Sequence, residues 1–233
     1  MKQLAAEHAT RRVVSGMKLG LGTGSTVRYV LDALAQRLRK GELADIVGVP
    51  TSEATTQQAQ ELGIALATLA EQPRLDLTLD GADEIDADLH VIKGLGGAML
   101  REKMVALAAR ELVIVADESK LSTQLGSKSR LPVEVVQFGW SIHMPFLQRL
   151  GAQPRLRTTA NGSPYITDNG NYILDCTFPD GIDTPAELAE ALDRHVGIVG
   201  HGLFLGMATE AYIGTTEGIS VLRKPAGKGE RHT

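Results

Sequence analysis

Residues 79–103 read LDGADEIDADLHVIKGLGGAMLREK, and this stretch decides how the rest of the chain can be arranged. It begins with two aspartates three positions apart, Asp80 and Asp83, and continues through a short apolar run into Lys93. A glycine-rich turn, 94–97, leads into a predicted helix that carries Glu102 in its first turns. Moving a proton on a carbon beside a carbonyl requires a base and a group that stabilises the developing negative oxygen. The stretch contains residue types for both tasks.

Outward from this stretch, apolar strands alternate with helices. The sequence predicts strands at 17–21, 46–49, 65–69, 75–79 and 112–116 and helices at 2–15, 27–40 and 51–62. Such alternation is typical of an α/β fold, a doubly wound and mostly parallel sheet. Ligands of these sheets bind outside the carboxyl ends of the strands. Asp80 directly follows the strand at 75–79, so it lies where chemistry is expected.

From Leu131 onward the order of the elements changes. Apolar runs and turn residues predict strands at 131–136, 155–158, 171–178 and 198–204 and helices at 141–150 and 184–195. The order β-α-β-β-α-β is that of a ferredoxin-like α+β unit. We therefore expect a second, smaller domain at 129–206. Strands at 211–213 and 219–222 are expected to return to the first domain, which would comprise 1–128 and 207–233.

The composition is that of an ordinary globular protein, with 43% hydrophobic and 22% charged residues among 233. The formal charge of -4 and an aromatic content of 4% give no reason to expect nucleic-acid binding. No apolar run approaches the length that spans a membrane. Cys176 is the only cysteine, which excludes an intrachain disulfide and favours a reducing, cytoplasmic location.

A second glycine-rich segment, GLGTGST at 20–26, joins a predicted strand to a predicted helix. Backbone N–H groups and the helix dipole favour an anion at such a junction. The segment is not a Walker loop, because Ser25 stands where the lysine belongs, and its third glycine comes one residue early for a dinucleotide fingerprint. Taken alone, the segment fits a ligand-free turn better than a phosphate cradle. The hydroxyls of Thr23, Ser25 and Thr26 keep the cradle as the alternative.

The charged residues of the opening stretch also have structural interpretations. Glu102 is expected well away from the apolar stripe of its helix, which would consist of Leu100, Met104, Leu107 and Ala108. A glutamate in that position is usually solvated. A lysine at the end of a strand is more often a surface charge than a catalytic cation. The glycine turn favours a shared site, because it brings the helix start close to the lysine.

Neither a metal nor a cofactor is predicted. The acidic residues between positions 80 and 88 could hold a hard cation, but they lack the spacing of an EF-hand. The six histidines are scattered along the chain without the spacing of a zinc site. A metal site is therefore the weaker interpretation of the acidic run.

Six motifs follow one another along the chain: GLGTGST at 20–26, TSEATT at 51–56, DGADEID at 80–86, KGLGGAMLREK at 93–103, ADESK at 116–120 and LPVEV at 131–135. With this series the chain resembles the ribose-5-phosphate isomerases of the A type, and the resemblance covers nearly its whole length. TDNGN at 167–171 and LFLG at 203–206 agree with the same family. The resemblance implies interconversion of ribose 5-phosphate and ribulose 5-phosphate through an enediol, without a metal, in the pentose phosphate pathway.

The resemblance also implies a role for each matching charged residue. Glu102 would be the general base that shuttles a proton between C1 and C2 of the sugar. Lys93 would stabilise the enediolate oxygen. Asp80 would handle the hydroxyl protons at C1 and C2, and Asp83 would hold sugar hydroxyls and assist ring opening.

Substrate binding is expected from the loops around these four residues. The implied binding residues are Thr23, Gly24, Ser25, Thr26, Gly81, Ala82, Gly94, Leu95, Gly96, Lys120 and Lys2, with the lysines neutralising phosphate. Leu95 departs from the many relatives that have glycine there. The family further implies a homodimer or homotetramer. The alternative is a non-enzymatic sugar-phosphate-binding protein on the same fold, which should lack the base and the lysine.

Overall fold

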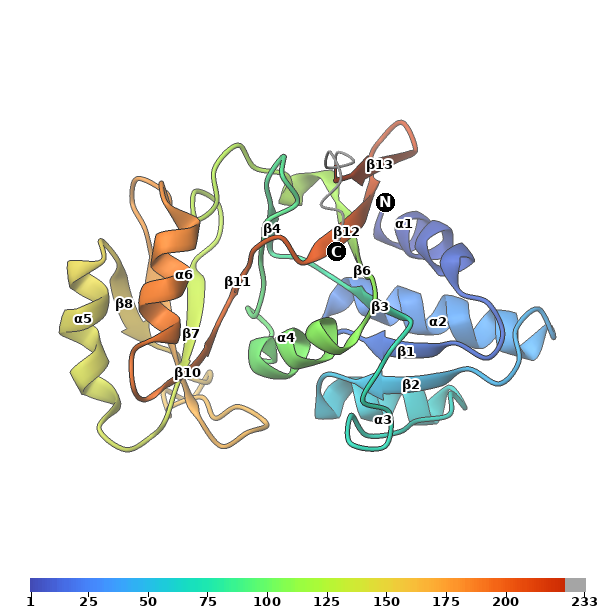
Figure 1. Ribbon diagram of the computed structural model, residues 1–233, viewed down its shortest axis with the longest axis horizontal. Coiled ribbons are helices and arrows are strands. Elements are labelled where there is room, and N and C mark those ends of the chain that lie inside the picture. The colour runs from blue at the N-terminus through green and yellow to red at the C-terminus, as the bar shows by residue number, and fades with distance from the viewer. Residues whose placement is uncertain (225–233) are drawn as a thin grey trace, which may run out of the picture.

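The computed structural model describes residues 1–224, and its largest sheet has six strands in the order β13-β12-β6-β3-β1-β2 (Figure 1). The strands are β1 (Lys18–Leu21), β2 (Val47–Pro50), β3 (Leu77–Asp80), β6 (Leu112–Asp117), β12 (Ala208–Gly214) and β13 (Ile219–Arg223). Only the β12–β13 pair is antiparallel within this sheet. The predicted mostly parallel sheet is confirmed. The end of the chain that was predicted to belong to it, 225–233, lies outside the described residues.

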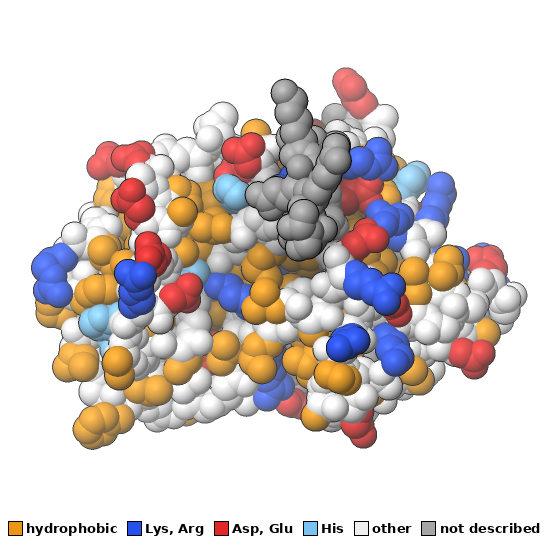
Figure 2. Space-filling view, in the orientation of Figure 1, with side chains coloured by type: hydrophobic (Ala, Val, Ile, Leu, Met, Phe, Trp, Pro, Cys, Tyr) orange, Lys and Arg blue, Asp and Glu red, His pale blue; other side chains and the backbone are white. Residues whose placement is uncertain are grey.

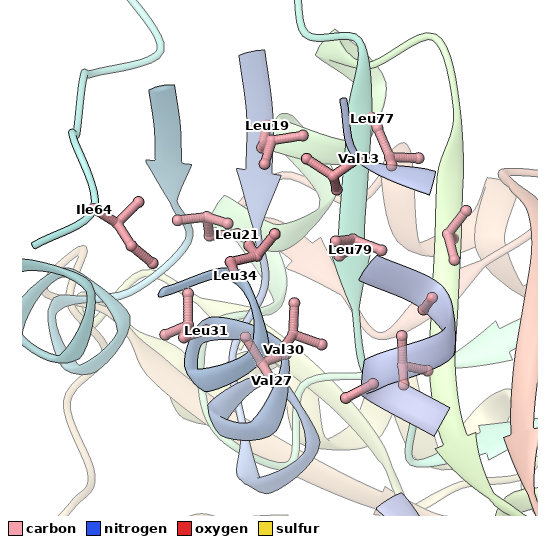
Figure 3. Packing of buried hydrophobic residues seen from close by; sticks show 14 of the residues in the cluster. Val13, Leu19, Leu21, Val27, Val30, Leu31, Leu34, Ile64, Leu77 and Leu79 are labelled. Atoms are coloured by element: carbon pink, nitrogen blue, oxygen red, sulfur yellow. The ribbon is translucent and has the colours of Figure 1, made fainter. Parts of the chain in front are cut away.

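One face of this sheet is covered by α1 (Lys2–Ala9), η1 (Thr10–Arg12), α2 (Ser25–Arg39) and α3 (Glu53–Glu61). Side chains alternate between the two faces of a strand, so Leu19 and Leu21 of β1 both point to these helices (Figure 3). They pack with Leu77 and Leu79 of β3 and with Val27, Val30, Leu31 and Leu34 of α2. Removing this apolar surface from water is the main force that holds the layer together.

The opposite face carries α4 (Met99–Ala108) and a small antiparallel sheet in the order β11-β5-β4. Its strands are β4 (Glu84–Ile85), β5 (Val91–Ile92) and β11 (Leu203–Phe204). Thr78 of β3 donates to the Val105 carbonyl of α4 at 3.4 Å, which places α4 directly on the sheet. Helices therefore lie on both faces, as a doubly wound fold requires. Asp80, two residues beyond Thr78, points to the same side as α4.

The second sheet is antiparallel, in the order β10-β7-β9-β8. Its strands are β7 (Leu131–Val135), β8 (Gln153–Leu156), β9 (Tyr172–Thr177) and β10 (Ile198–His201), and its helices are η3 (Trp140–Ile142), α5 (His143–Arg149) and α6 (Pro185–Asp193). The helices pack on one face through a core that includes Val133, Leu147, Leu174 and Leu192. The predicted ferredoxin-like order is confirmed. The exact domain boundaries stay a prediction.

Two predicted strands are wrong. Residues 65–69 form no strand, because Leu66 makes only an isolated bridge to Gly48 at the edge of the sheet. The predicted strand 198–204 divides at Gly202 into β10 and β11, which belong to different sheets. Gly202 donates to the Pro132 carbonyl and accepts from the Lys93 amide, and a side chain there would collide with the Lys93 carbonyl. The glycine thus lets the chain pass between the two sheets.

Candidate active site

Three charged side chains meet where β3, β5 and α4 approach one another. Asp80 is the last residue of β3, and Lys93 directly follows β5. Glu102 lies in the first turn of α4. Because β3 pairs in parallel with β1 and β6, its carboxyl end opens at the edge where α/β sheets bind ligands. The structure therefore brings the predicted base, cation and first aspartate into one cluster.

The ammonium of Lys93 is the centre of this cluster. Its Nζ lies 2.9 Å from Asp80 Oδ1 and 3.2 Å from Glu102 Oε1. It also donates to the Gly81 carbonyl at 2.7 Å, so its three N–H groups face three acceptors. The side chains of Asp80, Lys93 and Glu102 are 0%, 2% and 4% exposed. Buried charges need partners, and here one cation serves two carboxylates.

This arrangement moves the pKa of each group. Burial raises the pKa of Glu102 to about 8; the charge of Lys93 opposes this rise and the charge of Asp80 adds to it. Burial raises the pKa of Asp80 as well, against the attraction of Lys93. For Lys93, burial favours the neutral amine, but the surrounding carboxylates outweigh it and raise its pKa. The cluster thus contains a carboxylate that can exchange a proton near neutral pH, as general acid–base catalysis requires.

Glu102 has one oxygen available for that exchange. Within residues 1–224, its buried Oε2 has no hydrogen-bond partner, and the same holds for Asp80 Oδ2. Leaving a buried acceptor unpaired costs roughly 1–3 kcal/mol. An oxygen kept unpaired at this cost beside a shared cation is suited to receive a proton from a bound molecule.

The predicted orientation of α4 is wrong. Met104 and Leu107, expected in the buried stripe, are 51% and 71% exposed, whereas Glu102 is 3% exposed. The residues of α4 that are buried are Met99, Glu102, Val105 and Ala106. Apolar residues occur all around this helix, so their pattern could not identify the inner face. Glu102 can occupy the inner face because Lys93 compensates its charge.

The glycine turn between Lys93 and α4 has a backbone conformation that explains why it contains glycines. Gly94 and Gly97 adopt φ values of 98° and 87°, a region that other residues rarely enter. The Gly97 amide donates to the Gly94 carbonyl at 2.9 Å, which closes the turn. Asp83 Oδ2 accepts from the Leu95 amide at 2.9 Å, so this predicted substrate residue also braces the turn. The Leu95 side chain is 37% exposed and needs no glycine there.

The predicted phosphate cradle lies at the start of α2. Gly24, with φ of 114°, is the N-cap residue of α2, and it leaves backbone N–H groups of the first turn without helical partners. A side chain at Gly22 would collide with the Asp80 carboxylate, which explains that glycine. The Thr23 hydroxyl turns inward to Thr51 and Ser52, at 2.7 and 2.8 Å. This hydroxyl is therefore already paired within the loop, a contact that the sequence does not indicate.

Two lysines border the cradle. Lys2 Nζ donates to Ser25 Oγ at 3.1 Å and lies 3.8 Å from Asp117 Oδ2. Lys120 lies in η2 (Glu118–Lys120), immediately after the carboxyl end of β6. Asp117 was missed as a candidate although it ends β6, the same signal that identified Asp80. It orients Lys2 and also caps η2 by accepting from the Ser119 amide at 3.0 Å.

A small cavity of about 90 Å³ joins the cradle to the charged cluster. Its lining consists of Lys2, Thr23, Gly24, Ser25, Thr26, Gly81, Ala82, Asp83, Lys93, Gly94, Gly96, Glu102 and Lys120. All the predicted site residues except Asp80 and Leu95 therefore line one cavity. Lys2 and Lys120 lie with the start of α2 at one part of the cavity lining, and Lys93 and Glu102 belong to the other.

In the described part of the chain, no group of three or more His, Cys, Asp and Glu side chains is placed to share a metal ion. Among residues 1–224, no helix is both long and apolar enough to cross a bilayer.

Comparison with known proteins identifies relatives of this chain. The model of the family "Ribose 5-phosphate isomerase A (phosphoriboisomerase A)" matches residues 47–218. The chain is 56% identical over 225 residues to ribose-5-phosphate isomerase A of Synechococcus sp. (strain JA-3-3Ab), covering 96% of this chain and 97% of the relative. It is 53% identical over 227 residues to the enzyme of Roseiflexus sp. (strain RS-1), covering 97% of each.

Solved structures agree with these relatives. Ribose 5-phosphate isomerase from Plasmodium falciparum is similar with a TM-score of 0.92 and 40% identity, over 96% of this chain and 97% of that one. A D-ribose-5-phosphate isomerase in complex with phospho-erythronic acid has a TM-score of 0.92 and 38% identity, over 95% and 97% of the two chains.

Fold and site together define an α/β protein with a buried lysine–carboxylate cluster beside the glycine-rich start of α2. The chain belongs to the ribose 5-phosphate isomerase A family, and it is an aldose–ketose isomerase. The alternative of a non-enzymatic sugar-phosphate-binding protein gains no support, since the relatives given above are isomerases.

Proposed function

We propose that Glu102 shuttles the proton by which this enzyme interconverts D-ribose 5-phosphate and D-ribulose 5-phosphate. With the open-chain aldose bound, Glu102 removes the proton on C2, and electrons move to the C1 carbonyl oxygen. An enediolate results. Glu102 then returns the proton to C1 while the hydroxyl proton on O2 moves to O1, which leaves the ketose. One carboxylate can serve both carbons if it is held over the C1–C2 edge of the sugar.

The observation that carries this proposal is the position of Lys93 between Asp80 and Glu102, at 2.9 and 3.2 Å. A fixed cation beside the base stabilises negative charge on the enediolate oxygen, which exists only during the reaction. Asp80 shares the same cation and supplies a second carboxylate for the hydroxyl protons at C1 and C2. Asp83, which lines the cavity, is assigned to sugar hydroxyls and ring opening.

The phosphate is assigned to the opposite end of the cavity. The backbone of Gly24 to Thr26 offers donors at a helix start, and Lys2 and Lys120 bring positive charge. Gly81, Ala82 and the turn 94–96 are assigned to the sugar between the two ends. A relative bound to phospho-erythronic acid, itself a phosphorylated polyol acid, supports a phosphorylated substrate. The proposal includes no metal and no cofactor.

The test is a coupled assay of ribulose 5-phosphate formation with Glu102→Gln. The amide keeps the shape of the side chain but cannot take a proton, so kcat should fall by about 10²–10⁴ while KM changes little. Glu187→Gln, on an exposed position of α6, is the matched control and should be unaffected. A loss in Glu102→Gln of less than tenfold would remove Glu102 from the role.

We also propose that the chain works as a homodimer or homotetramer. Met104 and Leu107 on α4 are more than half exposed, and Met104 borders an apolar hollow that includes Val49, Leu66 and Leu69. A partner subunit would remove this surface from water. Light scattering of the purified protein measures the mass, and Leu107→Glu should lower it if this face is the interface.

The remaining proposals concern location, partners and domains. Cys176 is a buried thiol, which suits the cytoplasm, and fractionation of source cells would test that location.

Positive and negative side chains are interspersed on the face seen in Figure 2, which suits a small-molecule substrate better than nucleic acid. We place the domain boundaries near residues 129 and 206, and limited proteolysis would test them.

A further inference from the structure

Arg157 reaches from the second sheet to the glycine turn of the active site. It directly follows β8, and its Nη1 donates to the carbonyls of Gly94 and Leu95 at 3.2 and 3.0 Å. Its Nε and Nη2 bind the two carboxylate oxygens of Asp175 at 2.9 and 2.5 Å. The side chain is only 10% exposed. A single guanidinium therefore connects β9 of the small sheet to the backbone between Lys93 and α4.

We propose that Arg157 is a positioning residue for the isomerisation, because it fixes the turn that sets the distance between Lys93 and Glu102. The turn is the covalent link between the two, and its shape depends on two glycines at φ of 98° and 87°. Such a turn has few intrinsic preferences and must be held from outside. This inference rests on the roles proposed above for Lys93 and Glu102.

The turn is held from both sides. Asp83 binds the Leu95 amide at 2.9 Å, and Arg157 binds the Leu95 carbonyl at 3.0 Å. The peptide groups of this segment are therefore anchored by a carboxylate from the large domain and a guanidinium from the small domain. A rotation of either peptide would break one of these contacts.

A second residue of the small domain, Tyr165, also contacts the glycine turn. A side chain at Gly97 would collide with the Tyr165 hydroxyl, so the Tyr165 ring packs directly on the turn. The Tyr165 amide donates to the Arg157 carbonyl at 2.9 Å, and the Arg157 guanidinium carbon lies 5.7 Å from the ring centroid. The ring thus also limits where the guanidinium can move.

The chemistry of this contact requires arginine. A planar guanidinium can bind a carboxylate with two N–H groups and direct a third nitrogen to carbonyl oxygens, whereas an ammonium is a single point. Asp175 is 7% exposed and pairs most closely with Arg157, at 2.5 Å, whereas its second partner, the exposed Arg130, lies 3.6 Å away, so the charge of Arg157 is largely compensated. Its effect on the reaction is therefore geometric.

The experiment compares Arg157→Lys and Arg157→Ala with Arg155→Ala in steady-state kinetics. Arg155 is an exposed residue of β8 two positions away and serves as the matched control. A displacement of about 1 Å in a catalytic group can cost about 10²-fold, so kcat of both Arg157 variants should fall about 10–100-fold. KM should change less than threefold, because the phosphate cradle is untouched. Arg155→Ala should match the wild type.

Thermal unfolding and chemical rescue separate positioning from simple stability. Each variant is assayed well below its Tm, and guanidinium ion at millimolar concentration should restore part of the kcat of Arg157→Ala. A folded Arg157→Lys with kcat within twofold of the wild type would overturn the proposal.

Failure of this inference is distinguishable from failure of the proposed function. If Glu102→Gln is inactive and Arg157→Lys is fully active, only the positioning role fails. If Glu102→Gln is fully active, the proposed base is wrong whatever Arg157 does.

Discussion

Glu102 in the large domain and Glu134 in the small domain are both buried, at 3% and 0% exposure, but their surroundings differ. Glu134 Oε1 accepts from Thr167, Asn169 and Asn171 at 2.8, 3.2 and 3.0 Å, all neutral donors of the TDNGN turn. Glu102 Oε1 faces one charged donor, Lys93, which it shares with Asp80. Each glutamate has a second oxygen without a partner among the described residues. Burial and an unpaired oxygen therefore do not by themselves identify a base.

Glu84 extends the comparison. This fully buried carboxylate accepts from the amides of Gly126, Lys128 and Ser129 at 3.0, 3.3 and 3.1 Å, which ties the segment before β7 to β4. Glu84 and Glu134 are anchors, because each is held by several fixed neutral donors and not by a shared cation. Glu102 instead competes with Asp80 for one cation and borders the cavity. Competition for charge at a cavity distinguishes a site from an anchor.

After loss of the base itself, the largest effect is expected from Lys93→Met, which removes the cation that sets Glu102 apart from the anchors. Loss of one preorganised charge that stabilises an oxyanion costs about 10²–10³ in kcat, or about 3–4 kcal/mol. The fold should persist, because the two carboxylates can take up protons when their cation is lost. Steady-state kinetics and circular dichroism measure the two effects, with the exposed Lys18→Met as control. Full turnover in Lys93→Met would show that another group stabilises the enediolate.

Glu134→Gln should have the opposite profile, with a loss of stability and little loss of kcat. An amide oxygen accepts less strongly than a carboxylate, and a weakened buried network of this kind costs about 1–3 kcal/mol. For a chain of this size, each 1 kcal/mol lowers Tm by roughly 2–4 °C. Thermal unfolding at pH 8 measures the change. A Glu134→Gln variant with unchanged Tm and reduced kcat would break the distinction between anchor and base.

Thermal unfolding of Glu102→Gln should show no loss of Tm, in contrast to Glu134→Gln. The pKa of Glu102 is raised to about 8 in the fold, so folding favours its protonated form. The stability that this group contributes is present below its ordinary pKa and is lost as the pH rises toward 8. Glutamine resembles the protonated form and removes that loss. Tm of Glu102→Gln at pH 8 should therefore equal or exceed that of the wild type, whereas Tm of Glu134→Gln falls.

The pH dependence of kcat/KM should report the ionisation of Glu102. A base must be deprotonated to act, and burial raises the pKa of Glu102 to about 8. Since the second ionisation of a phosphate lies near pH 6, the useful range starts at about pH 7. The value of kcat/KM should rise about tenfold from pH 7 to 9 and level off above the pKa. A flat profile over this range would contradict a raised pKa in the free enzyme.

The sequence predicts the parts of this site that depend on strand ends. Asp80 ends one apolar strand and Lys93 follows another, and the rule that parallel sheets bind ligands at their carboxyl ends predicts Asp80, which the structure brings next to Lys93. The burial of Glu102 was not predictable from helical pattern, because apolar residues surround α4 on all sides. Its inward position depends on the charge of Lys93, which is a tertiary contact.

The contribution of the small domain was also invisible in the sequence. Arg157, directly after β8, pairs with Asp175 of the neighbouring strand β9. It also contacts Gly94 of the glycine turn, which is 63 positions away in the sequence. Nothing in the local pattern around either residue indicates such a contact. Glycines were the better guide, since Gly22, Gly97 and Gly202 each mark a place where another group approaches the backbone closely.

The smallest effect is expected at the phosphate end, from Lys120→Ala. Lys120 is half-buried beside the cradle, and its proposed contact to the phosphate changes little between the bound substrate and the transition state. An interaction of this kind contributes to binding but not to the chemical step, so KM should rise about threefold to tenfold while kcat stays near the wild-type value. Glu102→Gln should show the reverse, a lower kcat with little change in KM.

Steady-state kinetics of the two variants on ribose 5-phosphate, and of the wild type on free ribose, measure these effects. Free ribose should be a very poor substrate, because phosphate binding is what orients the reacting carbons. Equal efficiency on free ribose would leave the loop at 22–26 as a turn without a ligand.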